Sequence, residues 1–201
     1  IVYGSSFAAP QIAAIAGLVH QKYKQQFGVV PNASLVKAVL FNTAHDLGNP
    51  GPDYTFGYGI PNANKAIYTI DNNQFFEGDI IEDQFKTHNI TVPAGLKKLN
   101  VALCWTDKEG SPIASKSIVN DLDLKLVTPS GDTILPWKLN PSLFKKPAIK
   151  GVDNINTNEQ VTIENPVAGN YKIVVKGSIV PFGPQNYSVT YFNQKSEIEL
   201  T

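Results

Sequence analysis

The spacing of hydrophobic positions changes at about residue 72. Before this point apolar side chains recur every three to four residues, which predicts helices. We expect these helices over residues 8–27, 32–44 and 61–68. After it, short apolar runs alternate with turn sequences, a pattern that predicts β-strands. We expect these strands over residues 88–92, 99–105, 122–127, 160–163, 171–176 and 187–192.

The two patterns predict two domains, residues 1–72 and residues 73–201. Many short strands with regular turns favour an antiparallel sandwich or jelly roll for the second domain, which is long enough for its own core. The first domain reads as the helical remnant of an α/β fold and is not expected to hold a core by itself. Its first helix is expected to be buried on most sides of its N-terminal half, with Pro10 in the first turn. Asn32 is a candidate N-cap for the second helix.

Composition excludes several classes of function. The 17 basic residues are all Lys and are balanced by 17 acidic ones, so nothing favours binding to nucleic acid. The single cysteine, Cys104, lies in an apolar run and is expected to be a buried hydrophobe. The sequence contains no run of about 20 apolar residues, the length that would predict a membrane span. The chain has no Met and starts within a strand-like stretch, so we expect a fragment of a longer protein.

Ser6 is the candidate nucleophile, because it lies between small residues just before an apolar helix. Backbone N–H groups at a helix N-terminus can stabilise a developing oxyanion, but the hydroxyl also needs a base within about 3 Å. His20 lies 14 residues along the same helix, about 21 Å away. His88 falls in a predicted strand and reads as a surface residue. His45 is therefore the only candidate base that geometry allows, although a histidine in a polar loop is usually solvated.

The stretch Gly4-Ser5-Ser6-Phe7-Ala8-Ala9-Pro10 resembles the nucleophile motif of subtilisin-like serine proteases, the subtilases. The likeness continues through residues 40–44 and the segment 57–66, in the order the family has them. It implies that Ser6 is the acylated nucleophile and that Ser5 and Ser6 support the oxyanion hole, with Ser5 in place of the usual Thr. The catalytic Asp and His and the oxyanion Asn would lie in missing upstream sequence, which makes His45 a weaker candidate.

The same resemblance implies a secreted serine endopeptidase that cleaves polypeptides, of which this C-terminal fragment alone is inactive. Residues 76–194 resemble the β-sandwich that follows the catalytic domain in some bacterial alkaline subtilases, a module similar to the P domain of kexin-like convertases. Two alternatives to an enzyme stay open. The sandwich could be a module that binds protein or glycan, which exposed Trp137 or Tyr191 would favour, or a brace attached to a vestigial protease domain.

Acidic residues in the second domain form a candidate calcium site. Asp121 and Asp123 are two apart at the start of a strand, so their carboxylates point to one side, and Asp107 ends another strand. Asp153 adds oxygen ligands in a loop together with Asn156 and Glu159. Oxygen ligands without Cys or His suit Ca²⁺, and the related alkaline subtilases bind calcium in this module. The alternative is that Asp121 and Asp153 only accept hydrogen bonds from turn N–H groups.

Overall fold

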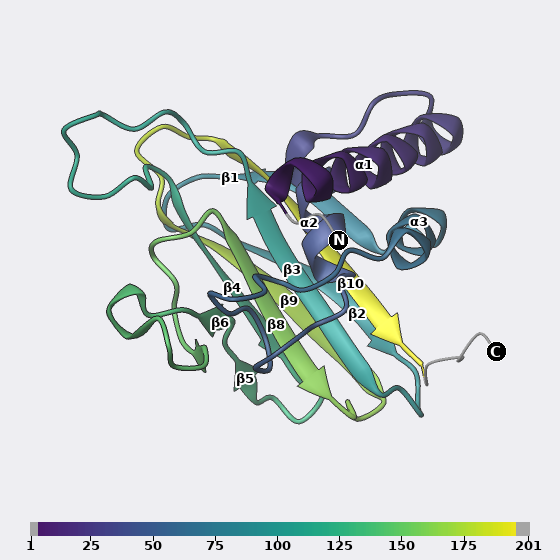
Figure 1. The fold of residues 1–201 in the computed structure, drawn as a ribbon. Coiled ribbons are helices and arrows are strands. Elements are labelled where there is room, and N and C mark those ends of the chain that lie inside the picture. The colour runs from purple at the N-terminus through teal and green to yellow at the C-terminus, as the bar shows by residue number, and fades with distance from the viewer. Residues whose placement is uncertain (1–3, 196–201) are drawn as a thin grey trace.

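The computed structural model describes residues 4–195, in which three α-helices precede a β-rich part (Figure 1). The helices are α1 (Ser5–Phe27), α2 (Ala33–Asn42) and α3 (Ala63–Asp71). The strands and one 3-10 turn are β1 (Phe75–Ile80), β2 (Phe85–Val92), β3 (Lys98–Trp105), β4 (Asp121–Val127), β5 (Thr133–Ile134), β6 (Trp137–Lys138), η1 (Pro141–Leu143), β7 (Ile149–Lys150), β8 (Asn158–Glu164), β9 (Gly169–Ile179) and β10 (Gln185–Gln194).

Two four-stranded antiparallel sheets face each other, with strand orders β1-β10-β3-β8 and β2-β9-β4-β5. Alternate side chains from both sheets meet in one apolar core. Its largest fully buried members include Trp105, Leu103, Leu122, Leu124 and Ile173. The predicted sandwich is therefore present. The outward-facing residues of β2 are exposed, so this sheet shows the alternation of a strand with one solvated face.

β3 is buried along nearly its whole length because both of its faces are covered. Leu99, Val101 and Leu103 face the sandwich core. Ala102 and Cys104 point the other way and pack against Ala38 and Phe41 of α2. This double cover explains why residues 99–105 are apolar without alternation. It also confirms that Cys104 is a buried hydrophobe, and burial raises the pKa of its thiol to about 11.

The three helices form a second, smaller core beside this sheet (Figure 1). Val19 and Tyr23 of α1 contact Leu35 and Val39 of α2 and Ile70 of α3 within one cluster. The expectation that this part of the chain holds no core of its own is therefore wrong. The cluster is small, however, and it uses only one side of α1.

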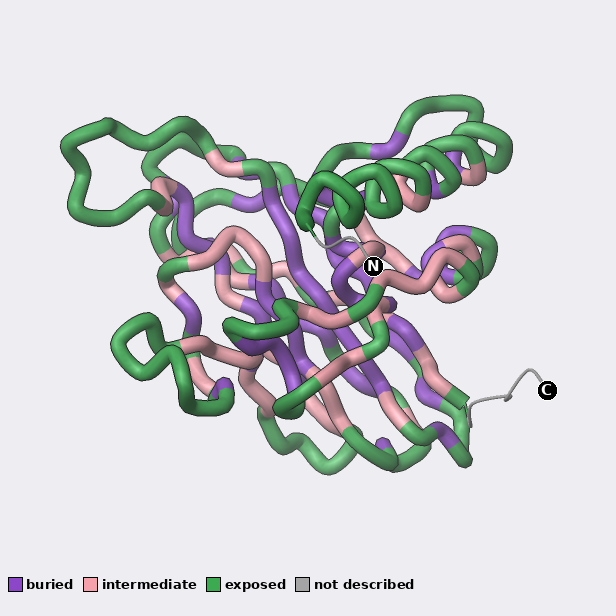
Figure 2. Tube along the Cα trace, viewed as in Figure 1, coloured by how far each residue is buried: buried purple, intermediate pink, exposed green. Residues whose placement is uncertain are grey.

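The expected burial of α1 is reversed in the structure. Its N-terminal half, including Phe7 and Ile12, is exposed, while the buried residues Val19 and Tyr23 lie in its C-terminal half, in which Leu18 is also exposed (Figure 2). The cluster that α1 shares with α2 and α3 begins at Ile15 and continues along one side of the second half of α1. An apolar helix surface on the outside is the signature of a contact surface, since soluble proteins rarely leave such patches uncovered.

Two details at the helix ends also differ from expectation. The helix α1 begins at Ser5, so Pro10 lies inside it instead of in the first turn. Asn32 precedes α2, but its side chain does not cap the helix and instead donates to Glu77 Oε1 at 2.7 Å. Asn62 does cap α3, accepting from the backbone N–H of Lys65 at 3.0 Å.

All six predicted strands are present, as parts of β2, β3, β4, β8, β9 and β10. β1 was not expected, because its sequence Phe75–Ile80 contains Glu, Gly and Asp and shows no clear apolar run. The two-residue strands β5, β6 and β7 are too short to leave a period in the sequence. Within residues 4–195 no helix has both the length and the apolar character needed to cross a membrane.

Candidate active site

Ser6 lies in the first turn of α1 and is exposed to solvent. Gly4 precedes the helix with φ +155°, a backbone conformation that glycine adopts without strain. Its carbonyl accepts a 3.0 Å hydrogen bond from the N–H of Phe7, which closes the turn around Ser5 and Ser6. Gly4 thus determines the direction in which the chain enters α1. It leaves the serine hydroxyl open to a reactant.

The N-terminus of α1 is suited to stabilising negative charge that develops on a bound reactant. The first N–H groups of an α-helix have no acceptor within the helix, and the positive end of the helix dipole lies there. The first turn contains no acidic residue that would neutralise this field. Pro10 has no N–H, so the carbonyl of Ser6 receives no helical hydrogen bond from it.

None of the three histidines lies where Ser6 could use it. His20 is exposed on α1, 14 residues beyond the serine. His45 forms a bridge with Ile60 through its backbone and lines a pocket to which α1 contributes no residue. His88 is half-buried and not a surface residue as expected, because its ring stacks on Phe76.

Residues 44–60, which include the Gly57–Gly59 part of the motif, form a compact loop after α2. The carboxylate of Asp53 holds it together by accepting hydrogen bonds from the N–H groups of Asn49, Thr55 and Phe56 at 2.7–3.1 Å. The bond from Phe56 is the main reason that the pKa of Asp53 is lowered. Gly59 has φ +101°, and a Cβ there would lie 2.0 Å from the carbonyl oxygen of His45. The second glycine of the motif is therefore required by a close backbone approach.

A seam of buried polar groups joins this helical part to the sandwich. Asn42, at the end of α2, is fully buried and donates to the carbonyl of Thr190 at 3.3 Å. Its own carbonyl accepts from Asn100 at 3.0 Å, and its side-chain oxygen accepts from Gln160 at 3.3 Å. At the other end of α2, the hydroxyls of Ser34 and Ser188 lie 2.8 Å apart. These contacts fix α2 across β10 and β3.

Trp137 and Tyr191 do not form an exposed aromatic platform. The ring of Trp137 packs against Gly51, where a Cβ would lie 2.6 Å from the indole. Its Nε1 donates to the hydroxyl of Thr162 at 2.9 Å. Tyr191 is partly buried against the sandwich core. The observation that would have favoured a glycan- or protein-binding module is therefore missing at these two residues.

The acidic residues proposed for calcium divide into two groups. The carboxylates of Asp107 and Asp153 accept hydrogen bonds from the loops in which they lie. Asp107 accepts from the N–H groups of Val119 and Asn120 at 2.7 and 2.9 Å, which closes the long β3–β4 connection. Asp153 accepts from the backbone and side chain of Asn156 at 3.3 and 2.6 Å. The alternative of turn hydrogen bonds thus describes Asp153 well, but not Asp121.

Asp121, Asp123 and Glu159 form the second group, and each has one buried carboxylate oxygen without a hydrogen-bond partner. Burial raises the pKa of Asp121 to about 6, and the neighbouring Asp123 adds to the shift. Burial also raises the pKa of Glu159 well above its usual value, even though its other oxygen accepts from Leu124 N–H at 2.6 Å. Glu159 belongs to β8 and not to a loop as expected. Across residues 4–195, no three Asp, Glu, His or Cys side chains converge as a ready metal site.

Comparison with known proteins identifies the first part of the chain. The family model described as "Subtilase family" matches residues 1–59. The chain is 29% identical over 206 residues to the Serine protease/ABC transporter B family protein tagA of Dictyostelium discoideum, a match that covers 92% of this chain and 12% of that protein. It is 38% identical over 66 residues to the Neisserial autotransporter lipoprotein NalP of Neisseria meningitidis serogroup B, covering 33% of this chain and 6% of that protein.

The chain therefore spans about an eighth or less of the length of these relatives. Among solved structures, the pre-peptidase C-terminal domain of a Bacillus anthracis collagenase aligns with 58% of this chain and 86% of its own. The identity of 15% and the TM-score of 0.35 are too low to support an argument about the fold. The family match covers the serine-bearing helix, the helix that follows it and the glycine-containing loop. Through residues 1–59 the chain therefore resembles the subtilase family, and its relatives are named as a serine protease or an autotransporter.

Proposed function

We propose that this chain supplies the nucleophile of a secreted serine endopeptidase, with Ser6 attacking the peptide carbonyl. The observation that carries the proposal is an exposed serine in the first turn of a 23-residue helix, inside the segment that matches the subtilases. In this reaction the hydroxyl oxygen bonds to the carbonyl carbon and the proton passes to a histidine base. The backbone N–H of Ser6 and the helix dipole stabilise the resulting oxyanion.

The catalytic Asp and His and the oxyanion Asn would come from protein outside residues 1–201. The placement of the three histidines supports this division, because each is committed elsewhere or too far along α1. The exposed apolar side chains Phe7, Ile12 and Leu18 would pack against that remaining part of the catalytic domain. A polypeptide is the substrate. The residues that select its side chains would also lie outside this chain.

A fluorophosphonate probe applied to the full-length protein tests this proposal. We expect the probe to label Ser6, because only an activated serine reacts at a useful rate. The Ser6→Ala variant should lose the label, while Ser142→Ala, a change at an exposed serine outside the motif, should keep it. Intact, folded protein that takes no label, or S6A protein labelled as strongly as the wild type, would contradict the proposal.

We infer that the sandwich is a jelly roll that braces the catalytic domain. The strand orders β1-β10-β3-β8 and β2-β9-β4-β5 support the first point. Along the chain most successive strands of the two sheets alternate between one sheet and the other, as they do in a double-sheet jelly roll. The buried seam between α2 and the strands β3 and β10 supports the second. Replacing Phe41 by Ala should lower the stability of the whole chain. A variant in which only the helical part melts would instead show that the two parts are independent.

We also propose a calcium ion beside Asp121, Asp123 and Glu159, with Asp153 close by. The support is chemical: buried carboxylate oxygens without partners repel one another, and a cation relieves both the repulsion and the missing contacts. Since the side chains do not converge on one point, main-chain and water oxygens would complete the shell. Asp107 contributes charge but keeps its turn hydrogen bonds.

Calorimetry on the full chain tests the calcium proposal. Ca²⁺ should bind and raise the melting temperature, and Mg²⁺ should have a smaller effect because it tolerates irregular sites poorly. Asp123→Asn should weaken binding by removing one charge while keeping a partner for Ser178. The absence of any calcium-dependent shift in melting temperature would remove the ion from the proposal and leave the bracing role intact.

A further inference from the structure

The connection between β6 and β7 projects from the side of the sandwich as an exposed loop (Figures 1 and 2). The two short strands pair antiparallel, so residues 139–148 form the loop of a hairpin. Every residue of this loop except Leu139 and Ala148 is exposed. The loop lies apart from α1, the surface that the rest of the proposed catalytic domain would cover (Figure 1).

The two faces of this hairpin have different surroundings. Residues directly opposite each other in an antiparallel pair lie on the same face. Trp137 and Lys150 form one such pair, and on their face the indole packs against Gly51, where a Cβ would lie 2.6 Å from the ring. Lys138 and Ile149 form the other pair, and Ile149 is 65% exposed. The hairpin is thus fixed to the chain by one face, while the other stays open.

The tip of the loop has a defined conformation that leaves its apolar side chains outside. The side chain of Asn140 accepts from the N–H of Ser142 at 3.0 Å. The carbonyls of Asn140 and Leu143 accept from the N–H groups of Leu143 and Lys146 at 2.9 and 2.8 Å. Within this turn Leu143 is 53% exposed and Phe144 is 60% exposed. Soluble proteins rarely gather exposed apolar side chains in one place, which marks this tip as a contact surface.

Positive charge surrounds these apolar side chains. Residues 133–152 contain four lysines and no acidic residue, although the chain as a whole has no net charge. Lys138, Lys145 and Lys146 form no ion pair in the described part of the chain. The amine of Lys145 lies over the ring of Phe144, 5.9 Å from its centroid, so a cation and an apolar side chain are direct neighbours.

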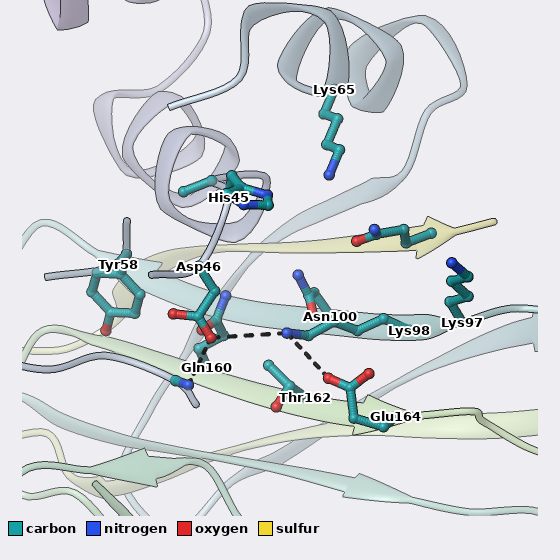
Figure 3. Close-up of a pocket in the computed structure, with 13 residues that line it drawn as sticks. His45, Asp46, Tyr58, Lys65, Lys97, Lys98, Asn100, Gln160, Thr162 and Glu164 are labelled. Carbon is teal, nitrogen blue, oxygen red and sulfur yellow. Dashed lines mark hydrogen bonds and ion pairs between the residues drawn. The ribbon is translucent and has the colours of Figure 1, made fainter. Parts of the chain in front are cut away.

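The carboxylates beside the base of the hairpin do not neutralise this charge. Gly51, on which Trp137 packs, lines a polar pocket of about 280 Å³ whose walls come from the loop after α2, from α3, and from β3, β8 and β10 (Figure 3). In this pocket the amine of Lys98 lies 3.2 Å from Glu164 Oε1 and 4.0 Å from Asp46 Oδ2. Both carboxylates are therefore paired with a lysine outside the hairpin.

We propose that the loop 139–148 docks the protein on an anionic lipid bilayer. Its exposed apolar side chains would enter the boundary between headgroups and acyl chains, and its lysines would lie at the level of the anionic headgroups. Lysine suits this position because its stem can lie along apolar groups while its amine stays in water. A bilayer is favoured over an acidic protein because the apolar residues lie on a projecting tip, which a fluid surface accommodates. The proposal goes beyond peptidase activity and does not depend on Ser6.

Sedimentation of the full chain with lipid vesicles tests this proposal. We expect binding to phosphatidylcholine vesicles that contain about a third phosphatidylserine, and binding at least about tenfold weaker to pure phosphatidylcholine. Raising the salt concentration from about 0.1 M to about 1 M should release the chain, because the range of the electrostatic attraction shortens from about 10 Å to about 3 Å. Phe144→Trp should report insertion, since its emission should shift to shorter wavelengths on the phosphatidylserine vesicles.

The apolar half of the surface is tested by the double variant L143S/F144S. It should weaken binding to the phosphatidylserine vesicles about tenfold or more, because both side chains would otherwise leave water. The matched control is V29S/V30S, which changes two adjacent apolar residues between α1 and α2 that are 60% and 67% exposed. This control should bind like the wild type.

The charged half is tested by K145Q/K146Q, which should also weaken binding about tenfold or more. The control K24Q/K172Q removes the same charge at two exposed lysines outside the loop and should have little effect. Circular dichroism on each variant shows whether the fold is kept.

Three outcomes would overturn the proposal. The first is that the chain does not sediment with the phosphatidylserine vesicles. The second is that L143S/F144S or K145Q/K146Q binds them as tightly as the wild type does, which would place the contact elsewhere. The third is that F144W protein sediments with the vesicles while its emission stays unchanged, because the tip of the loop would then remain in water.

Discussion

The N-terminal half of helix α1 and the strand β3 are both rich in apolar residues but have opposite surroundings. β3 is covered on one face by the second sheet and on the other by α2, so nearly every residue is buried. α1 touches α2 and α3 along one side of its C-terminal half and exposes apolar side chains elsewhere. Figure 2 shows this contrast as a buried sheet beneath a largely exposed helix. The apolar residues of β3 are covered by other parts of the described chain. Those on the exposed side of α1 would be covered by the rest of the proposed catalytic domain.

The contrast also separates the two roles we assign. The apolar residues of the sandwich are covered within the described chain, by its two sheets and by α2, so the sandwich can act as a support. The helix that carries Ser6 does not, which is what a nucleophile helix shared with a larger catalytic domain requires. Three predictions test how far this separation holds.

The largest effect is expected from truncating the core of the sandwich. Leu103→Ala should lower the free energy of unfolding by about 2–5 kcal/mol, since Leu103 is fully buried and its loss leaves a cavity. Leu18→Ala on α1 should cost about 0.5 kcal/mol or less, because that side chain is 46% exposed. Urea denaturation of both variants measures the difference. Equal losses would show that the exposed face of α1 is covered in the chain itself.

An intermediate effect is expected where the subtilase loop depends on glycine. Gly59→Ala should destabilise the chain by about 1–3 kcal/mol more than Gly57→Ala. Both positions have positive φ, but only at Gly59 would the added Cβ meet a backbone atom, the carbonyl oxygen of His45. Melting temperatures of the two variants give the comparison. Similar values would mean that the loop moves away from His45 at little cost.

The smallest effect is expected from pH and concerns the sandwich alone. Burial, and then the charge of Lys86, lowers the pKa of His88 below its ordinary value of 6.5. The unfolded chain therefore takes up the proton first, and stability present above pH 6.5 is lost as pH falls toward the folded pKa. We expect this loss to be small, because the ring of His88 is only half-buried.

Between pH 8 and pH 5 the buried carboxyls of Asp121 and Glu159, whose pKa values are raised, add stability and oppose the loss from His88. The contribution of His88 is therefore measured as the difference between the wild type and His88→Gln in the change of stability from pH 8 to pH 5, and the wild type should fare worse on acidification than H88Q. The matching change at the exposed helix residue, His20→Gln, should preserve the wild-type pH dependence. If H88Q and the wild type change in stability equally between the two pH values, His88 does not contribute to the response. The tyrosine that contacts His88 Nε2 at 3.0 Å, Tyr187, would then be the next residue to change.

Much of this fold follows from local pattern. Alternation and turn residues predicted six of the long strands, and helical spacing predicted all three helices. The sequence pattern does not predict β1, because β1 is a strand through its pairing with β10 and not through its composition. The position of Pro10 was misjudged because the true first residue of α1 depends on the turn at Gly4, which the helical period does not contain.

The candidate sites show the same division. Ser6 could be named from its motif, because a nucleophile at a helix N-terminus needs only neighbouring residues to be recognised. Glu159 comes beside Asp121 through the packing of β8 against β4, whereas the sequence pattern alone predicts that Glu159 lies in a loop. The sequence makes Asp107 and Asp153 calcium candidates beside Asp121, with Asp123 and Asp153 the better ones, yet the turns of Asp107 and Asp153 already use their oxygens.

By itself the sequence determined the helix that carries Ser6, the glycine loop, the strands and the balance of charge, because each depends on residues close together in the chain. The tertiary structure decided which apolar faces are covered, which carboxylates are left without partners, and that Asp46 and Lys65 share a pocket with Asn100 and Lys97. The reason is physical: burial and electrostatic coupling depend on distances between segments far apart in the chain, and local periodicity does not contain those distances.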